Sequence, residues 1–312
     1  HSQEIMKHTN ILVLATACLL SAGVASAQTA MPSLRIEQDP VAAGMGFTGL
    51  ASTTGTAWSA LRNSSVIPLS EKKMDFGFSY QSWAPSGAKD SNMAFGAAFK
   101  AGERFGVSLA GTLQNGEEYN VTDATGNASG TFKPSTISAG LGFGVKIIDN
   151  LSVGVNARFA SQKLTKDDSY TAFCGDVFVS YRFSDFNLAA GAASLGSKVK
   201  GADGNSYSLP ASARVGVDWT KAFAEAHALK LGADFDYFFS GSVTAAAGVQ
   251  YSFRDMVFAR AGYHYGADKA VLPSFASAGL GVKFFGVELN AAYLFASDAL
   301  GGTMTFGLGY SF

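Results

Sequence analysis

The chain has few charged side chains, no long apolar run beyond its N-terminus and almost no cysteine. Lys, Arg, Asp and Glu make up 15% of the 312 residues, against roughly 25% in soluble domains. The formal net charge of −1 gives no reason to expect nucleic acid as a partner. After residue 27 there is no run of about eighteen apolar residues, which excludes a helical membrane span.

The two cysteines, Cys18 and Cys174, lie in different parts of the chain. Cys18 falls inside an N-terminal apolar stretch, Ile11 to Leu20, that follows a short polar start at Met6–His8 and precedes Ala25-Ser26-Ala27. This order is typical of a secretory signal peptide cleaved before Gln28. We therefore predict that residues 6–27 form a signal peptide and that residues 1–5 lie upstream of it. Cys174 is then left without a disulfide partner, and we interpret it as a small buried residue rather than a nucleophile.

What the chain does have is strict alternation. Even positions from Met304 to Phe312 are apolar and bulky, and odd positions from Thr303 to Ser311 are small or polar. Because successive side chains of a strand point to opposite sides, this is a ribbon with one apolar face. The pattern recurs about fourteen times after Lys73. We expect strands near 73–83, 91–100, 104–115, 135–147, 150–163, 171–183, 186–195, 207–219, 228–239, 241–253, 256–265, 274–284, 286–296 and 302–312.

Connections between these ribbons alternate between short and long. Tight links at 101–103 or 184–185 alternate with longer polar ones, of which Gly116–Pro134 is the longest. Outer-membrane barrels have short periplasmic turns and longer extracellular loops. Two links break the rule, since 220–227 is longer than expected and the turn near Ser240 is short. With both ends of the barrel periplasmic, the 116–134 loop is predicted to be extracellular.

In each strand the charged residues occupy the positions that alternate with the bulky apolar ones, so they lie on the opposite face of the strand. A Lys or Arg on the lipid face at mid-bilayer costs roughly 2–4 kcal/mol, which explains the segregation, whereas a soluble sandwich would expose its charges. We predict an all-β fold, a transmembrane antiparallel β-barrel of about 14 strands with a polar lumen, in the bacterial outer membrane. The candidate lumen polar network is Arg158, Asp176, Arg182, Arg214, Asp218, Lys230, Asp234, Asp236, Arg260 and His264.

The network also raises the question of catalysis. Asp234 and Asp236 share one lumen-facing strand side, and Arg260 and His264 share another. No nucleophilic serine is tied to His264 by spacing, so we expect ion pairs with Lys230 and Arg214 rather than catalysis. We predict no enzyme, no cofactor and no metal. A barrel hydrolase remains as a hypothesis in which His264→Ala abolishes an esterase or protease activity.

Residues 28–71 precede the barrel at 72–312 and lack clean alternation. They contain Gly44-Met45-Gly46-Phe47-Thr48-Gly49, which fits the dinucleotide pattern G-x-G-x-x-G. No apolar strand precedes it and no βαβ unit follows, so we interpret it as a tight backbone path against the barrel wall, where a Cβ would not fit. Glycines also crowd the inward parity of the strands. Strand bending and lumen room for a plug or ligand are both open as causes, and we expect an N-terminal hatch or plug segment.

The stretch from Asp39-Pro40-Val41 through Gly44-Met45-Gly46 to Gly49-Leu50-Ala51 resembles the opening motif of the PorV/PorQ family. Further similarity lies at Glu71–Trp83, Val145–Gly154 and Ser169–Val177, and Tyr310-Ser311-Phe312 resembles the C-terminal signature of outer-membrane barrels. The Asn-Pro-Ala signature of the family is replaced here by Asn63–Pro68. The candidate hatch motif is Asp39, Pro40, Gly44, Met45, Gly46 and Gly49.

The resemblance implies a FadL-like barrel of fourteen strands with an N-terminal hatch, and a role in the type IX secretion system of Bacteroidetes. The leading hypothesis is accordingly a PorV/PorQ-type barrel that acts in type IX protein secretion or in surface attachment of cargo. Its partners would be outer-membrane lipid, secretion-system components and cargo signal domains. The alternative is a FadL-like outer-membrane channel for hydrophobic small molecules, which the hatch-like segment and the Gly-rich lumen favour.

Overall fold

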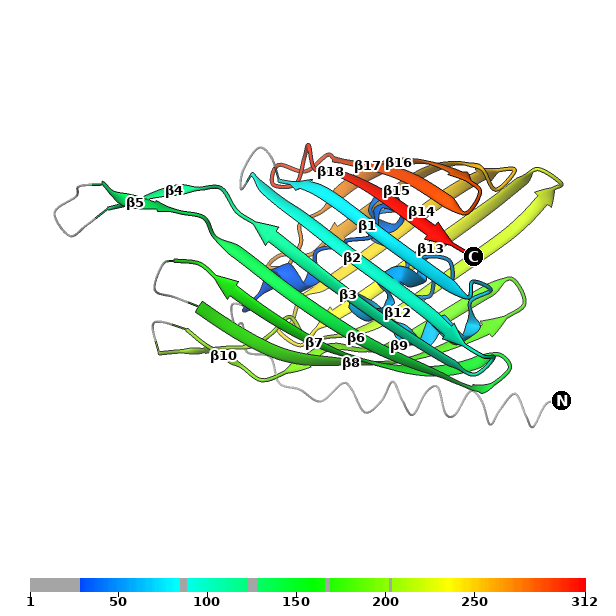
Figure 1. Ribbon diagram of the computed structural model, residues 1–312, viewed down its shortest axis with the longest axis horizontal. Helices are drawn as coiled ribbons and strands as arrows, with labels where there is room; N and C mark the ends of the chain where they lie inside the picture. The colour runs from blue at the N-terminus through cyan, green and yellow to red at the C-terminus, as the bar shows by residue number, and fades with distance from the viewer. Residues whose placement is uncertain (1–28, 85–88, 123–127, 166–168, 202–203) are drawn as a thin grey trace.

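Fourteen of the strands close into one antiparallel barrel, in which β1 pairs with β18. The computed structural model describes residues 29–84, 89–122, 128–165, 169–201 and 204–312, so the signal peptide predicted at 6–27 lies outside the described residues. Every barrel strand pairs with the barrel strands before and after it in the chain (Figure 1). This confirms the predicted fold class.

The strand bounds follow the alternation of the sequence closely. The barrel strands are β1 (Met74–Trp83), β2 (Asp90–Ala101), β3 (Phe105–Asn115), β6 (Ser135–Ile148), β7 (Leu151–Lys163), β8 (Ser169–Phe183), β9 (Phe186–Gly196), β12 (Ser212–Ala224), β13 (His227–Phe238), β14 (Val243–Phe253), β15 (Val257–Gly266), β16 (Phe275–Phe284), β17 (Val287–Phe295) and β18 (Met304–Ser311). Only β12 departs from its expected range by more than two residues.

The prediction for β12 was wrong at both ends. The strand starts at Ser212, after Pro210, and runs past Trp219 to Ala224. Lys221 carries a charge on the apolar parity, but its side chain is exposed and pairs with Asp185 of the β8–β9 turn at 3.5 Å. The link to β13 is therefore the short turn at 225–226, and this exception to the alternation of link lengths disappears.

Two loops contain hairpins that the alternation did not predict. Between β3 and β6, β4 (Tyr119–Thr122) pairs with β5 (Ala128–Phe132), and between β9 and β12, β10 (Val199–Lys200) pairs with β11 (Ser206–Tyr207). Both hairpins lie at one end of the barrel, here called the loop end, and the C-terminus lies at the opposite turn end (Figure 1). The short link near Ser240 remains, as a tight turn in which Gly241 N–H donates to Phe238 O at 2.9 Å.

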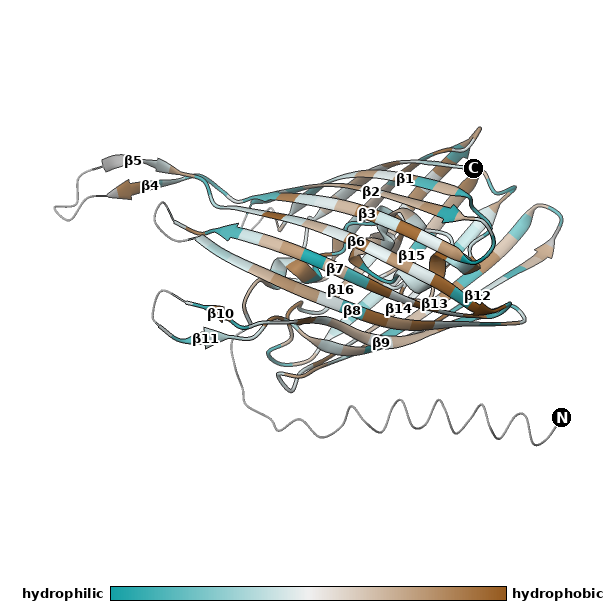
Figure 2. Cartoon of the chain, turned by 60° about the horizontal axis from the view of Figure 1, so that its bottom comes forward, coloured by the Kyte–Doolittle hydropathy of each residue, from teal (hydrophilic) through white to brown (hydrophobic). Residues whose placement is uncertain are grey.

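The outward face of the barrel is apolar. Leu141, Phe143 and Leu308 expose 65%, 44% and 49% of their surfaces, where a two-sheet sandwich would bury them. Figure 2 shows hydrophobic residues alternating with polar ones along the strands. Such a surface suits lipid rather than water.

Among the described residues no helix is long and apolar enough to cross a membrane.

The described residues before β1, from Thr29 to Lys73, lie inside the barrel (Figure 1). This luminal segment, residues 29–73, contains four short helices: η1 (Pro32–Arg35), α2 (Pro40–Gly44), η2 (Thr56–Leu61) and η3 (Ser64–Leu69). Its first described residue, Thr29, bridges to Ser208 at the loop end, and its last, Lys73, donates its N–H to Phe312 O at the turn end. The segment therefore runs the length of the lumen before the barrel begins. We call residues 29–38 the strap and residues 39–70 the anchored segment.

Candidate functional site

The inward glycines of the barrel wall face the backbone of the anchored segment. A Cβ added at Gly248 would lie 2.3 Å from Met45 O, and one at Gly96 would lie 2.3 Å from Ala57 O. Such distances are shorter than any packing contact, so only glycine fits here. Of the two causes considered for the inward glycines, room for a plug is thereby confirmed. The wall glycines whose added Cβ would lie within 3.0 Å of the luminal segment are Gly77, Gly96, Gly106, Gly140, Gly142, Gly144, Gly154, Gly216, Gly232, Gly248, Gly262, Gly279 and Gly307.

The first half of the hatch motif starts a helix against this wall. Asp39 is the N-cap of α2, and its side chain accepts a hydrogen bond from Val41 N–H at 2.9 Å. Pro40 occupies the first helical turn, where its missing N–H has no consequence, and its ring lies over Gly307. At the end of the helix, Gly44 packs against Gly279.

The second half of the motif turns the chain along the wall. Gly46 has φ +73°, donates its N–H to Ser277 Oγ at 2.9 Å, and has no room for a Cβ beside Tyr263. Gly49 has φ +136°, donates its N–H to Asp234 Oδ2 at 2.9 Å and offers its carbonyl to Arg62. The motif therefore follows a close backbone path against the barrel wall, as its glycines predicted.

The strap does not lie on the described wall glycines, and beyond the backbone bond from Ala30 N–H to Ser208 O at 2.9 Å it is held by side chains. Arg35 donates to Asp236, which also accepts from Arg214 Nε at 2.7 Å. Arg158 donates to Leu34 O at 3.3 Å. Arg35 lies outside the membrane-spanning strands, and burial, together with nearby Arg214, lowers its pKa to about 10, with Asp236 opposing the shift. The guanidinium therefore stays charged at neutral pH, and the strap depends on a buried ion pair.

Arg62 ties the strap to the anchored segment. Its guanidinium lies 2.7 Å from Glu37 and 3.1 Å from Asp39, and it donates to Gly49 O at 3.3 Å. Burial by itself lowers the pKa of Arg62, but the carboxylates of Glu37 and Asp39 outweigh burial and raise this pKa above its ordinary value. Arg62 thus stays positively charged and holds Glu37, Asp39 and Gly49 close to one another.

The other predicted lumen residues fall into separate groups. Arg158 pairs with Asp176 at 2.9 Å, Lys230 with Asp218 at 3.0 Å, and Arg260 with Glu288 at 3.3 Å. Arg182 donates to Leu69 O. Of the expected ion pairs with Lys230 and Arg214, Asp236 pairs with Arg214. Asp234 Oδ2 instead accepts the N–H groups of Gly49 and Leu50, and Lys230 also donates to Ser52 and Thr54.

His264 lies among aromatic rings rather than among ion pairs. Its ring stacks on Phe275 at 5.0 Å between centroids and meets Phe47 at 5.9 Å. A backbone group of Gly46 approaches the imidazole, but neither ring nitrogen has a partner in hydrogen-bond geometry. No described serine or cysteine is hydrogen-bonded to this histidine, and no described cluster of three or more His, Cys, Asp or Glu could hold a metal ion.

Sequence reasoning missed the polar residues that the luminal segment itself contributes. Arg35, Glu37 and Arg62 take part in three ion pairs around the strap, Arg35 with Asp236 and Arg62 with Glu37 and Asp39, yet none of the three was singled out. Their only signal was that they are charged within a segment otherwise built of small and apolar residues. Because no alternation fixes a face in this segment, the sequence did not say that they point inward.

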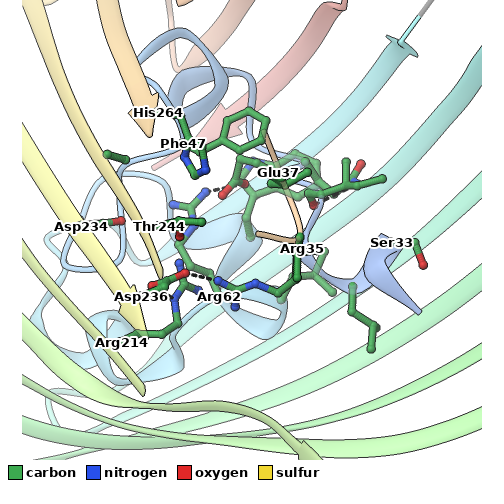
Figure 3. A pocket seen from close by; sticks show the side chains of 18 of the residues that line it. Ser33, Arg35, Glu37, Phe47, Arg62, Arg214, Asp234, Asp236, Thr244 and His264 are labelled. Atoms are coloured by element: carbon green, nitrogen blue, oxygen red, sulfur yellow. Dashed lines mark hydrogen bonds and ion pairs between the residues drawn. The ribbon is translucent and has the colours of Figure 1, made fainter. Parts of the chain in front are cut away.

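Two cavities lie between the luminal segment and the wall. The upper cavity, of about 70 Å³, lies beneath the strap and is lined by Phe47, Trp58, Phe238 and Leu272 as well as by Arg35, Arg214 and Asp236 (Figure 3). The lower cavity, of about 150 Å³, lies toward the turn end, and its lining includes the charged residues Asp75, Asp218, Lys230 and Glu288 beside apolar ones. Around the upper cavity the buried polar atoms without a hydrogen-bond partner are Ser33 Oγ, Gln38 Oε1, Arg62 Nε, Arg158 Nε, Asp234 Oδ1 and both ring nitrogens of His264.

No protein-family model matches the chain, and no curated protein matches it. Among solved structures, the toluene transporter TodX of Pseudomonas putida superposes with a TM-score of 0.61 at 11% identity, over 93% of this chain and 99% of that one. The toluene transporter TbuX of Ralstonia pickettii gives 0.57 at 13% identity, over 87% and 97%. The monoaromatic hydrocarbon channel CymD gives 0.57 at 14%, over 87% and 96%. The chain therefore has the fold of FadL-like outer-membrane barrels, with an exterior suited to the lipid of that membrane.

Proposed function

We propose that the protein is an outer-membrane channel that admits small hydrophobic molecules through a lumen closed by its own N-terminal segment. The observation that carries the proposal is the upper cavity beneath the strap. Phe47, Trp58 and Phe238 give it an aromatic lining, and it lies inside a barrel rather than on a surface. Small-molecule sites are typically concave and apolar with a few polar groups. The solved channels of the same fold, two of which are called toluene transporters, support the same class of permeant.

Uptake of a radiolabelled aromatic hydrocarbon tests this function directly. Purified barrel is reconstituted into vesicles and toluene entry is compared with empty vesicles, with Trp58→Ala and Phe47→Ala as cavity variants. We expect entry above the empty-vesicle rate, and a changed rate in both variants because both rings line the cavity. An equal rate with and without the protein would refute the proposal.

A second candidate is the role in type IX secretion or surface attachment that the PorV/PorQ resemblance implies. One observation favours it: the β4–β5 hairpin extends well beyond the barrel at the loop end (Figure 1), where it is available to a protein partner. Replacing residues 117–133 by a short Gly-Ser linker should then release cargo from the cell surface while toluene uptake persists. Full cargo retention after the replacement would count against this role.

A further inference from the structure

Cavities follow one another along the inside of the barrel from the loop end. A groove of about 520 Å³ at the base of the β4–β5 hairpin shares Gln114 and Thr136 with a small cavity of about 10 Å³. The small cavity shares Ser33, Leu34 and Gln38 with the upper cavity. Cavities that share lining residues lie next to each other, so these three lie in a row from the loop end to the middle of the lumen.

A matching row rises from the turn end. A cavity of about 440 Å³ near the β12–β13 turn shares Thr54, Lys230 and Gln250 with the lower cavity. Charged and amide side chains, such as Lys230, Gln250 and Asp255, are part of the lining on this side. Such groups can bind water and solutes that carry hydrogen-bonding groups, which bare hydrocarbon cannot replace.

The two rows meet at one place. Upper and lower cavities have two lining residues in common, Trp58 and Arg62. Both are buried, with 5% and 8% of their surfaces exposed. The side chains of Trp58 and Arg62 are therefore the partition between the two halves of the lumen, and Figure 3 shows Arg62 among the side chains that line the upper cavity.

The two members of the partition are fixed in different ways. Trp58 packs directly on wall backbone, where a Cβ at Gly77 would lie 2.8 Å from its ring. Arg62 is held only by polar contacts to Glu37, Asp39 and Gly49 O, all within the luminal segment. Glycine makes these contacts possible, since a Cβ at Gly49 would lie 2.8 Å from Arg62 Nη1 and one at Gly55 would lie 2.7 Å from Asp39 Oδ2. Arg62 can leave its place without moving the barrel wall, and Trp58 cannot.

We propose that Arg62, clasped by Glu37 and Asp39, is the gate of an axial pathway for small hydrogen-bonding solutes. The inference rests on the proposed channel function and adds to it a route, a class of solute and a closing residue. Release of Arg62 from the two carboxylates joins the upper and lower cavities into one path. Because the gate lies within the luminal segment, it opens without loss of the glycine contacts that seat this segment on the wall.

Ion conductance across planar bilayers, with potassium chloride as the probe, tests the gate. We expect low conductance for the parent protein and a rise of about tenfold or more for Arg62→Ala, because each hydrogen bond to a charged group that holds the closed form is worth about one factor of ten. Glu37→Gln combined with Asp39→Asn should give a smaller rise. Arg62→Lys should stay near the parent, since the ammonium still reaches the carboxylates.

Asn63→Ala separates gating from general loosening of the segment. Asn63 bonds Leu50 O, Ser180 Oγ and Ser65 N–H but lines neither the upper nor the lower cavity, so its variant should conduct like the parent. Folding of every variant is checked by the mobility shift of the unheated barrel on gels. Parent-like conductance of folded Arg62→Ala, or an equal rise in Asn63→Ala, would overturn the gate.

Toluene uptake by the same vesicles distinguishes failure of the gate from failure of the proposed function. Raised conductance in Arg62→Ala without any toluene entry, in parent or variant, would keep the axial gate and remove the hydrocarbon function. Toluene entry with unchanged conductance would keep the function and remove the gate.

Discussion

The strap and the anchored segment pass through the same lumen, yet they are held by opposite means. The anchored segment lies with its backbone on wall glycines, so its position is set by main-chain shape. The strap is attached by Met31, which belongs to a cluster with Ala160 and Val199, and by the bond of Arg35 to Asp236. A few side chains therefore decide whether the strap stays down, whereas the anchored segment is seated along its whole length. The difference teaches that a plug can be permanent in one part and releasable in another.

The largest expected effect comes from removing the anion that holds the strap. Asp236→Ala leaves Arg35 and Arg214 buried without their partner, and breaking a buried pair in this way costs about 3–5 kcal/mol. Hydrogen–deuterium exchange should show rapid exchange in residues 29–38 and parent-like protection in residues 39–70. Equal loss of protection in both parts would mean that they form one cooperative unit and would break the comparison.

The apolar anchor of the strap should matter somewhat less. Met31→Ala empties a site in which the side chain is 2% exposed, and truncating a buried Met costs about 2–5 kcal/mol, with the low end expected near a chain terminus. Limited proteolysis should cut the strap faster than in the parent. Exposed Met256→Ala at the turn end (41% exposed) serves as the matched control, and equal cleavage in both variants would show that Met31 does not hold the strap.

A larger side chain in the barrel wall should destabilise the anchored segment and leave the strap unaffected. Gly262→Ala places a methyl group 2.1 Å from Met45 C, and overpacking of this kind costs about 1–3 kcal/mol. The midpoint of urea unfolding in detergent should fall. Gly111→Ala, where the nearest atom is Ser138 O at 3.7 Å, is the control, and an unshifted midpoint for Gly262→Ala would mean that the wall yields.

The smallest effect belongs to a single cap within the anchored segment. Asn63 caps η3, and its side chain accepts the Ser65 N–H at 3.0 Å. Its replacement by alanine should lower the free energy of unfolding by about 1 kcal/mol, as loss of an N-cap usually does. Asn63→Asp keeps the acceptor for Ser65 N–H but, as a carboxylate, cannot donate to Leu50 O and Ser180 Oγ, so it should recover little of that loss. A variant as unstable as Asp236→Ala would show that seating depends on side chains after all.

The barrel could be predicted from sequence because lipid imposes one rule on every strand. Leu141 and Leu308 had to point outward and Arg158 and Asp218 inward, and a period of two is visible in each segment by itself. The rule failed at β12, where Lys221 lies on the apolar parity but beyond the apolar band. The lipid rule also made no prediction for the loops, where β4 and β5 are short and pair only with each other.

The site was less predictable because its contacts join distant parts of the chain. Arg35 and Asp236 lie 201 residues apart. The sequence around either residue does not indicate that the other is its partner. The inward glycines showed that something fills the lumen, and the Gly44–Gly49 motif showed which segment approaches the wall. The partners of each charge, such as Gly49 N–H for Asp234, depend on how the segment winds, which no repeating pattern records.

The cluster beneath Met31 gives the protein a built-in reporter. Cys174 belongs to that cluster, is 8% exposed and is the one cysteine in the part of the chain that the structure describes. A maleimide reagent can reach its thiol only when this cluster opens, either by lifting of the strap or by movement of the β9–β12 loop that contributes Val199 and Leu209, so the labelling rate measures how often the loop end opens. The native sequence thus supports a kinetic assay of its own opening, with no engineered label.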